Sequence, residues 1–317
     1  MLISVIIPVK NGDQTLGDCL ASIKEQTIAE NIEIIILDSY SNDKSLEIAQ
    51  QFNAKIINIP SGSFNHGLTR NEGIKYASGQ LLYFTVQDAR LAERNQLEKM
   101  AAHFEDKEIM AITGAQAVPH DLNKNPALWF IRYSKPQTVF KHLSPGTYRQ
   151  LSFQKQFEMT SEWDDVNAMY RRQALEQIPF TETDFAEDKL WAKDALIAGM
   201  KIGFDPSLLV YHYHHSTFVY TFKLEFTVNY HYFLYFNVYP RWPAFFKPAL
   251  SSIYQVWKKS ELKMMAKIYW SFHNFFRILG YAVSNIAFLV FGKFFGKNAL
   301  EKSYNFFCKK IPQGTVK

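Results

Sequence analysis

The sequence reads Gly79-Gln-Leu-Leu-Tyr-Phe-Thr-Val-Gln-Asp-Ala89 where its chemistry is most evident. An apolar run, Leu81 to Val86, leads to Asp88 and then gives way to polar and charged residues. This pattern is typical of a buried parallel strand that brings one carboxylate to its C-terminal end, the edge at which open α/β sheets bind ligands. Asp88 is therefore a candidate ligand for a divalent cation, which can in turn hold a diphosphate. A strand that merely ends in a capping Asp is the alternative.

Strands alternate with helices on both sides of this stretch. Apolar runs predict strands at 2–9, 32–37, 54–59, 81–86, 109–118 and 202–211. Helical spacing predicts helices at 15–26, 44–52, 68–77, 95–104, 171–178 and 188–199, whereas the region 119–158 has weaker periodicity. Strands that alternate with helices of about ten residues indicate βαβ units. The sequence therefore predicts the α/β class, with a mostly parallel sheet flanked by helices.

The composition excludes several classes of protein. Of the 317 residues, 47% are hydrophobic and 21% are charged, which predicts a folded chain with a substantial core. The net charge of +5 suits anionic ligands or an anionic membrane surface, but no dense Lys/Arg stripe indicates nucleic acid. Cys19 and Cys308 lie far apart, which fits a reduced cytoplasmic setting. A strand pattern directly after Met1 predicts that there is no signal peptide.

The character of the chain changes after His215, and we predict a catalytic domain over 1–217 and a helical, aromatic-rich region over 218–317. Within the second region, Ile278 to Phe291 is apolar but too short for a bilayer span. Aromatic residues and lysines around it favour peripheral membrane contact through residues 250–310, by an interfacial helix on an anionic leaflet. The alternative is that these helices pack on the catalytic domain or on a second copy of the chain in a homo-oligomer.

Three predicted strand ends converge on one edge of the sheet: Pro8-Val9-Lys10-Asn11, Asp38-Ser39 and Gln87-Asp88. An Asp at the second strand end can accept a hydrogen bond from a base or a ribose hydroxyl. The sequence contains neither a GxGxxG motif nor a P-loop, which argues against a dinucleotide-dependent dehydrogenase and an ATPase.

Six segments together resemble the family 2 glycosyltransferases, and within them the bacterial rhamnosyltransferase branch is most similar. They are Ser4-Val-Ile-Ile-Pro-Val-Lys-Asn11, Ile36-Leu-Asp-Ser-Tyr-Ser-Asn-Asp43, Phe64-Asn-His-Gly-Leu-Thr-Arg-Asn71, Thr85-Val-Gln-Asp-Ala89, Phe185-Ala-Glu-Asp-Lys-Leu-Trp191 and Val210-Tyr-His-Tyr-His-His215. The resemblance covers about residues 3 to 215 and implies a GT-A fold. Each segment alone is a weak signal, whereas six in the family's order are a strong one.

The resemblance also implies roles for individual residues. The donor site would comprise Pro8, Val9, Asn11, Asp38, Arg70, Gln87 and Asp88, in which Asp38 reads a pyrimidine base and Arg70 contacts the base or the diphosphate. Asp88 would bind Mg²⁺ or Mn²⁺, together with His212 or His214. One departure is that Val86 occupies the place of the first acid of the family's Asp-x-Asp element.

On the acceptor side, Asp188 matches the catalytic base that deprotonates the acceptor hydroxyl. Glu187 would orient either the acceptor or Asp188 itself. An ordinary pair of acids at a helix N-terminus is the alternative reading of these two residues. Trp163, Asp164, Asp165 and Asn167 are weaker candidates for lining the acceptor cleft, because ordinary polar positions on a protein surface would explain them nearly as well.

The resemblance implies an inverting glycosyltransferase that moves a sugar from a nucleotide-sugar donor. The expected reaction transfers rhamnose from dTDP-rhamnose onto a lipid-linked or growing surface glycan, at the inner face of a bacterial cytoplasmic membrane. One alternative is a transferase that uses a UDP-hexose or a UDP-N-acetylhexosamine. Another is a non-catalytic nucleotide-sugar-binding scaffold of a polysaccharide assembly complex.

Overall fold

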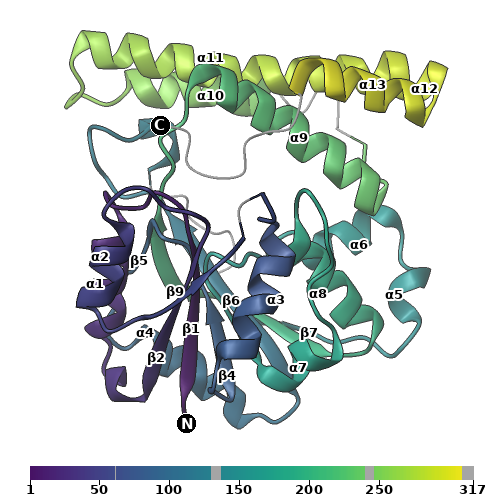
Figure 1. Ribbon diagram of the computed structural model, residues 1–317. Helices are drawn as coiled ribbons and strands as arrows, with labels where there is room; N and C mark the ends of the chain where they lie inside the picture. The colour runs from purple at the N-terminus through teal and green to yellow at the C-terminus, as the bar shows by residue number, and fades with distance from the viewer. Residues whose placement is uncertain (61, 130–136, 240–245, 309–317) are drawn as a thin grey trace. The chain divides into compact units, whose positions relative to one another are not determined.

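We describe a computed structural model of the chain, which covers residues 1–60, 62–129, 137–239 and 246–308 (Figure 1). The chain divides into two compact units. The first comprises Met1–Val118 and Ile131–Tyr213, and the second comprises Pro119–Phe130 and His214–Lys317. The second unit thus includes a short segment, 119–130, that the sequence patterns left unassigned.

A mixed sheet forms the centre of the first unit. Its strands are β1 (Ile3–Val9), β2 (Ile32–Asp38), β3 (Lys55–Asn58), β4 (Leu81–Phe84), β5 (Ala89–Leu91), β6 (Ile109–Ala117), β7 (Val139–Lys141), β8 (Ala168–Arg171) and β9 (Lys201–His212). They are ordered β3-β2-β1-β4-β8-β6-β9-β5, and β7 also pairs with β9. The first four strands in this order are mutually parallel. The carboxyl ends of β1, β2 and β4 therefore share one edge, as the sequence predicts.

The α/β class is confirmed, but the sheet is more mixed than the sequence patterns indicate. Strand β8 runs antiparallel to both β4 and β6, and β5 and β7 run antiparallel to β9. These three strands have only three or four residues each, so they offer almost no periodicity from which to predict them. The long strand β9 is held at its two ends by β7 and β5.

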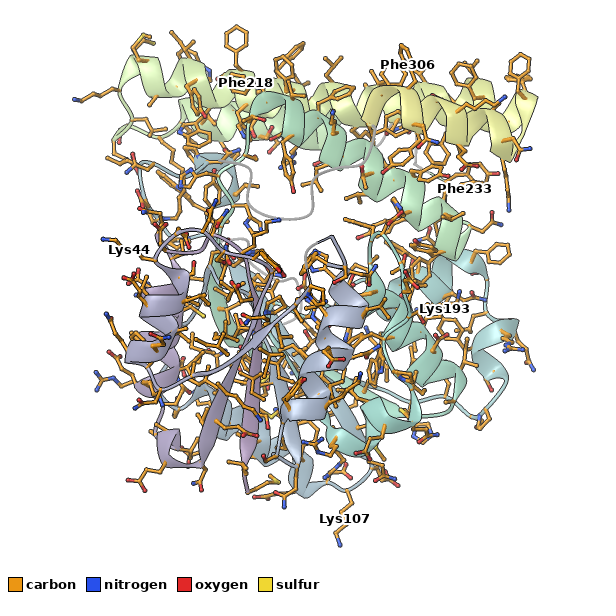
Figure 2. All side chains as sticks on the ribbon, in the orientation of Figure 1. Lys44, Lys107, Lys193, Phe218, Phe233 and Phe306 are labelled. Atoms are coloured by element: carbon orange, nitrogen blue, oxygen red, sulfur yellow. The ribbon has the colours of Figure 1, made fainter. Side chains whose placement is uncertain are left out.

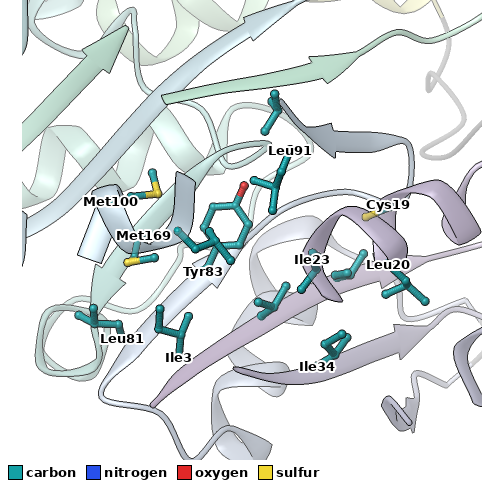
Figure 3. Close-up of a cluster of buried hydrophobic side chains, with 14 of the residues drawn as sticks. Ile3, Cys19, Leu20, Ile23, Ile34, Leu81, Tyr83, Leu91, Met100 and Met169 are labelled. Carbon is teal, nitrogen blue, oxygen red and sulfur yellow. The ribbon is translucent and has the colours of Figure 1, made fainter. Parts of the chain in front are cut away.

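Helices cover both faces of this sheet. They are α1 (Leu16–Lys24), α2 (Ser45–Gln51), α3 (His66–Tyr76), α4 (Gln96–Ala102), α5 (Thr147–Gln150), α6 (Phe153–Thr160), α7 (Arg172–Gln177) and α8 (Glu187–Ile197). Alternate residues of β1 enter different cores, because successive side chains of a strand point to opposite faces. Ile3, Val5 and Ile7 pack with α1 and α4 (Figure 3), whereas Ile6 packs in the core that α7 and α8 share.

The second unit is helical, as predicted. Its helices are α9 (Phe218–Phe236), α10 (Phe246–Trp257), α11 (Met264–Ala287), α12 (Lys293–Phe295) and α13 (Lys297–Cys308), and a π-helical segment, Phe288–Gly292, continues α11. Helices α9 and α11 pack closely: a Cβ on Gly280 would lie 2.3 Å from the carbonyl oxygen of Phe222. Phe226, Phe233, Phe288 and Leu300 form the small apolar core of this unit.

Candidate active site

Gln87 joins the end of β4 to the end of β1. Its side-chain oxygen accepts a hydrogen bond from the Lys10 backbone N–H at 2.8 Å, and its amide donates to the Lys10 carbonyl at 3.2 Å. The side chain is 7% exposed, so this reciprocal pair lies inside the sheet edge. Gln87 thereby fixes the position of the residue that follows it, Asp88.

Asn11 and Asp38 organise the loops at the ends of β1 and β2. Asn11 has a positive φ of 49°, which Asn tolerates better than most residues. Its backbone N–H donates to Ser41 Oγ at 2.9 Å, and its side-chain oxygen accepts from the Asn42 N–H at 2.9 Å. The Asp38 carboxylate accepts the Ser41 N–H at 3.2–3.3 Å. These loops are therefore cross-linked beside Pro8 and Val9, where the sequence places the donor.

Asp88 and His212 come from distant parts of the sequence and meet at this edge. Asp88 follows β4, and His212 ends β9, which pairs there with β5. His212 Nε2 lies 3.4 Å from Asp88 Oδ1, and their side chains are only 12% and 5% exposed. His214, the other candidate, lies two residues beyond His212 and begins the second segment of the second unit.

This group has the donor chemistry of a divalent-cation site. Gln116 Oε1 lies 2.7 Å from His212 Nδ1. An amide oxygen can only accept, so Nδ1 donates to it, and Nε2 is the ring nitrogen that faces Asp88 and is left as a candidate metal ligand. One carboxylate and one or two imidazoles suit Mn²⁺ better than Mg²⁺, which strongly prefers oxygen ligands. Gln116 was not anticipated from the sequence, where nothing marks it.

Arg70 lies in α3 and is 4% exposed. Its Nη1 donates to Glu187 Oε1 in a short contact, and its Nε lies 3.4 Å from Asp165 Oδ2. Burial would raise the pKa of Glu187, but the Arg70 charge outweighs it and holds that pKa below its ordinary value. Arg70 thus clamps α3 to the start of α8. Its contact with a base or a diphosphate stays a prediction.

Further bonds fasten the segment 180–187 onto α3. Asn65 caps this helix by accepting the Leu68 N–H at 3.1 Å, and its amide donates to the Thr183 carbonyl at 2.8 Å. Asn71 exchanges two bonds with the backbone of Phe180, at 2.8 and 3.0 Å. A Cβ on Gly67 would lie 2.6 Å from the Thr181 carbonyl, so only Gly fits there. The motif Phe64 to Asn71 therefore serves to hold the chain that precedes Glu187.

Asp188 lies in the first turn of α8. Ala186, the residue just before this helix, adopts a left-handed conformation with φ 60°. Such a conformation is strained for Ala and fixes the direction in which the helix begins. Asp188 Oδ1 accepts the Lys189 N–H at 2.7 Å. Burial, reinforced by nearby Glu187, Asp164 and Asp165, raises the pKa of Asp188 to about 8.

Asp165 is a second buried acid beside this pair. It accepts the Tyr170 hydroxyl, which in turn accepts the Trp163 indole N–H at 2.8 Å. Burial raises the pKa of Asp165 to about 6, although Arg70 opposes the shift. Lys189 Nζ donates to the Ser161 and Trp163 carbonyls at 2.9 and 2.6 Å, so α8 also holds this loop. Asp165 was a weak candidate for the acceptor cleft, whereas Lys189 was assigned no role from the sequence.

The other three weaker acceptor candidates lie in different surroundings. Trp163 is 4% exposed, and Asn167 is fully buried. The Asn167 side chain accepts from the Tyr83 hydroxyl at 3.0 Å and donates to the Leu208 carbonyl at 2.9 Å. Asp164 is the partly exposed member, and its carboxylate accepts the Val166 N–H at 2.8 Å. Of the three, Asp164 is therefore the one whose residue is not fully buried, and its acceptor role stays a prediction.

An α/β fold with a carboxylate–imidazole group at the strand ends and a high-pKa Asp at a helix start has the chemical groups that a group-transfer enzyme needs. Residues 4–179 match the family described as Glycosyl transferase family 2. The chain belongs to this family and is a glycosyltransferase.

The chain is similar to two curated relatives. It is 33% identical over 224 residues to the O-antigen chain rhamnosyltransferase RfbN of Salmonella typhimurium strain LT2, and the match covers 68% of each chain. It is 31% identical over 218 residues to the O-antigen chain rhamnosyltransferase WbaN of Salmonella anatum, covering 68% of this chain and 67% of that relative.

The fold also matches a solved structure, residues 1–349 of Staphylococcus aureus TarS in complex with UDP-GlcNAc. The TM-score is 0.58 at 16% identity, and the match covers 98% of this chain and 82% of that one. At this identity the likeness shows the GT-A fold, which confirms the expected fold class.

Proposed function

We propose that this enzyme transfers rhamnose from dTDP-rhamnose, with inversion, to a lipid-linked or growing surface polysaccharide at the inner face of a bacterial cytoplasmic membrane. The observation that carries the proposal is the high-pKa Asp188 at the start of α8, in a chain whose similar relatives are named O-antigen chain rhamnosyltransferases. The relatives support the choice of sugar, and Asp188 supports the chemistry.

Inversion requires a single in-line displacement at the anomeric carbon. Asp188 takes the proton of the acceptor hydroxyl while that oxygen bonds to the anomeric carbon and the bond to the diphosphate breaks. A pKa of about 8 makes Asp188 a stronger base than an ordinary Asp. Arg70 keeps Glu187 ionised, and that negative charge further raises the proton affinity of Asp188.

On the leaving side, Asp88 and His212 would hold Mg²⁺ or Mn²⁺, which supplies positive charge to the departing diphosphate. Gln116 orients His212 for this task, and Gln87 fixes the chain before Asp88. Val86 contributes no carboxylate, so His212 carries part of the work that a first acid would do. In this proposal Asp38 reads the base, and Pro8, Val9 and Asn11 line the donor.

A donor screen tests the choice of sugar. The purified full chain is titrated calorimetrically, in the presence of Mn²⁺, with dTDP-rhamnose, UDP-glucose, UDP-N-acetylglucosamine and GDP-mannose. We expect dTDP-rhamnose to bind most tightly, and the glycan product to have the anomeric configuration opposite to that of the donor. Tightest binding of a UDP-sugar would favour the alternative donor class, which the UDP-GlcNAc complex of TarS makes worth testing. Binding without transfer to any lipid-linked acceptor would favour the scaffold.

A further inference from the structure

The helix α11 carries an exposed apolar stripe. Within α11 its most exposed members are Met265 (75%), Phe272 (57%) and Ile286 (52%). From Met265 to Leu279 the exposed apolar residues recur every three or four positions, which places them on one helix face. The stripe continues beyond α11 and comprises Met265, Ile268, Phe272, Phe275, Leu279, Ile286, Leu289, Val290 and Phe294. Figure 2 shows Phe306, of α13, also standing out from the helices of this unit.

The opposite face of α11 is polar and buried. His273 Nε2 lies 3.2 Å from Ser216 Oγ, and the Asn274 oxygen accepts the Asn125 amide at 2.8 Å. Further along, Ser284 Oγ accepts the Asn229 amide at 2.7 Å. A surface helix of a water-soluble protein has the reverse arrangement, with its apolar stripe against the core. This reversed arrangement of polar and apolar faces indicates that the exposed face of α11 meets an apolar phase.

Basic residues surround this stripe. From Trp257 to Cys308 the sequence has eight Lys or Arg and two Glu, whereas the whole chain has a net charge of only +5. The exposed Lys258 and Lys263 lie just before α11, and Lys293 and Lys297 lie just after it. Between Arg277 and Lys293 the sequence carries no charged residue. Lysines at both ends of an apolar helix complement an anionic lipid surface.

Length and composition alone would let this helix cross a bilayer. Met264–Phe295 is the one such helix among the described residues, with a mean hydropathy of 1.6 in its most apolar window. Its contacts argue for a helix that lies along the surface instead. Within α11 the stripe occupies one face, and another face packs on α9, where Arg277 Nε lies 3.5 Å from Glu225 Oε1. A spanning helix would leave this ion pair at the middle of the bilayer, where charge is costly.

We propose that the second unit docks on an anionic lipid bilayer with α11 lying in the plane of the interface. The apolar stripe enters the region of the acyl chains, and the flanking lysines contact the head groups. A hollow of about 330 Å³, lined by Tyr239, Asn285, Phe288, Leu289 and Lys293, lies beside the stripe and offers a lysine to a head-group phosphate. The inference rests on the proposed function in one respect: docking on the membrane would give the enzyme access to a lipid-linked acceptor. Lipid binding, however, is measured without sugar transfer, so the two can fail separately.

Vesicle flotation of the full chain tests the proposal. We expect binding to vesicles of equal parts phosphatidylglycerol and phosphatidylcholine, and much weaker binding to phosphatidylcholine alone. The double variant Phe272→Ser/Phe275→Ser removes two rings of the stripe and should weaken binding at least about tenfold. Lys263→Gln/Lys293→Gln should weaken binding to the anionic vesicles about tenfold.

Matched controls lie in the first unit. Phe153, on α6, is 54% exposed, and Phe153→Ser should leave vesicle binding unchanged. The exposed Lys44 and Lys107, labelled in Figure 2, provide the control Lys44→Gln/Lys107→Gln. Circular dichroism of each variant establishes that it is folded.

Three outcomes would overturn the proposal. The first is equal flotation of the Phe272→Ser/Phe275→Ser variant and the unaltered chain. The second is protein that stays with membranes after alkaline carbonate extraction, which would mean that the helix spans the bilayer. The third is a lipid-free dimer that this variant converts into a monomer, which would make the stripe a contact between two copies.

Discussion

Replacing Asp188 with Asn should remove activity and at the same time stabilise the fold. The pKa of Asp188 is raised from an ordinary 3.8 to about 8, first by burial and then by neighbouring acids. Between these values the folded state keeps a proton that the unfolded state has lost, so the stability that Asp188 contributes falls as pH rises. This contribution to stability is fully lost once the pH exceeds the pKa that Asp188 has in the folded state. An Asn at this position has no proton to lose.

The size of this effect follows from the linkage of proton binding to folding. For a folded pKa of about 8, raising the pH from about 6 to about 8 costs the unaltered protein about 2 kcal/mol relative to the Asp188→Asn variant. Asn can still accept the Lys189 N–H, so the local hydrogen bond is retained. Loss of a general base should slow transfer about 10²- to 10⁴-fold.

Urea unfolding of both proteins at several pH values measures the stability difference, and transfer from the best donor measures the rate. The exposed Asp184, four residues earlier, provides the matched control Asp184→Asn. A stability difference between Asp188→Asn and the unaltered protein that does not widen with pH would refute the burial argument. Full activity of Asp188→Asn would refute the assignment of the base.

Arg70→Met should lower the free energy of unfolding, measured in urea, by about 3–5 kcal/mol, because two buried carboxylates lose their partner. A decrease below about 1 kcal/mol would contradict the role of Arg70 in holding α3 to the start of α8. Gln87→Met should lower the free energy of unfolding by about 1–3 kcal/mol, because the two hydrogen bonds between Gln87 and Lys10 are lost. Calorimetry should also show weaker donor binding. Unchanged donor binding would mean that these two bonds do not position the donor site. Gln116→Leu should weaken Mn²⁺ binding about 10- to 100-fold, because it frees the His212 ring to rotate. His212→Phe should weaken it further, and Mn²⁺ affinity that survives both changes would place the ion elsewhere.

The residues at the carboxyl ends of β1, β2 and β4 could largely be predicted from local sequence alone. The apolar runs of β1, β2 and β4 end in Pro8 to Asn11, Asp38 and Gln87-Asp88, and parallel pairing brings these ends together. Helix starts were less predictable. Helix α3 begins at His66, two residues before the expected Leu68, because the Asn65 side chain caps it and is itself tied to Thr183.

The sequence by itself determined the α/β class, the parallel half of the sheet, the helical C-terminal region and the carboxylates available for chemistry. These follow from periodicity and strand ends, which are local properties. Only the tertiary structure decided which side chains meet. It brought His212 to Asp88, placed Gln116 behind it, and closed Arg70 between Asp165 and Glu187. The pKa of Asp188 likewise depends on its burial in the fold and on the nearby Asp164 and Asp165, and no local pattern encodes those surroundings.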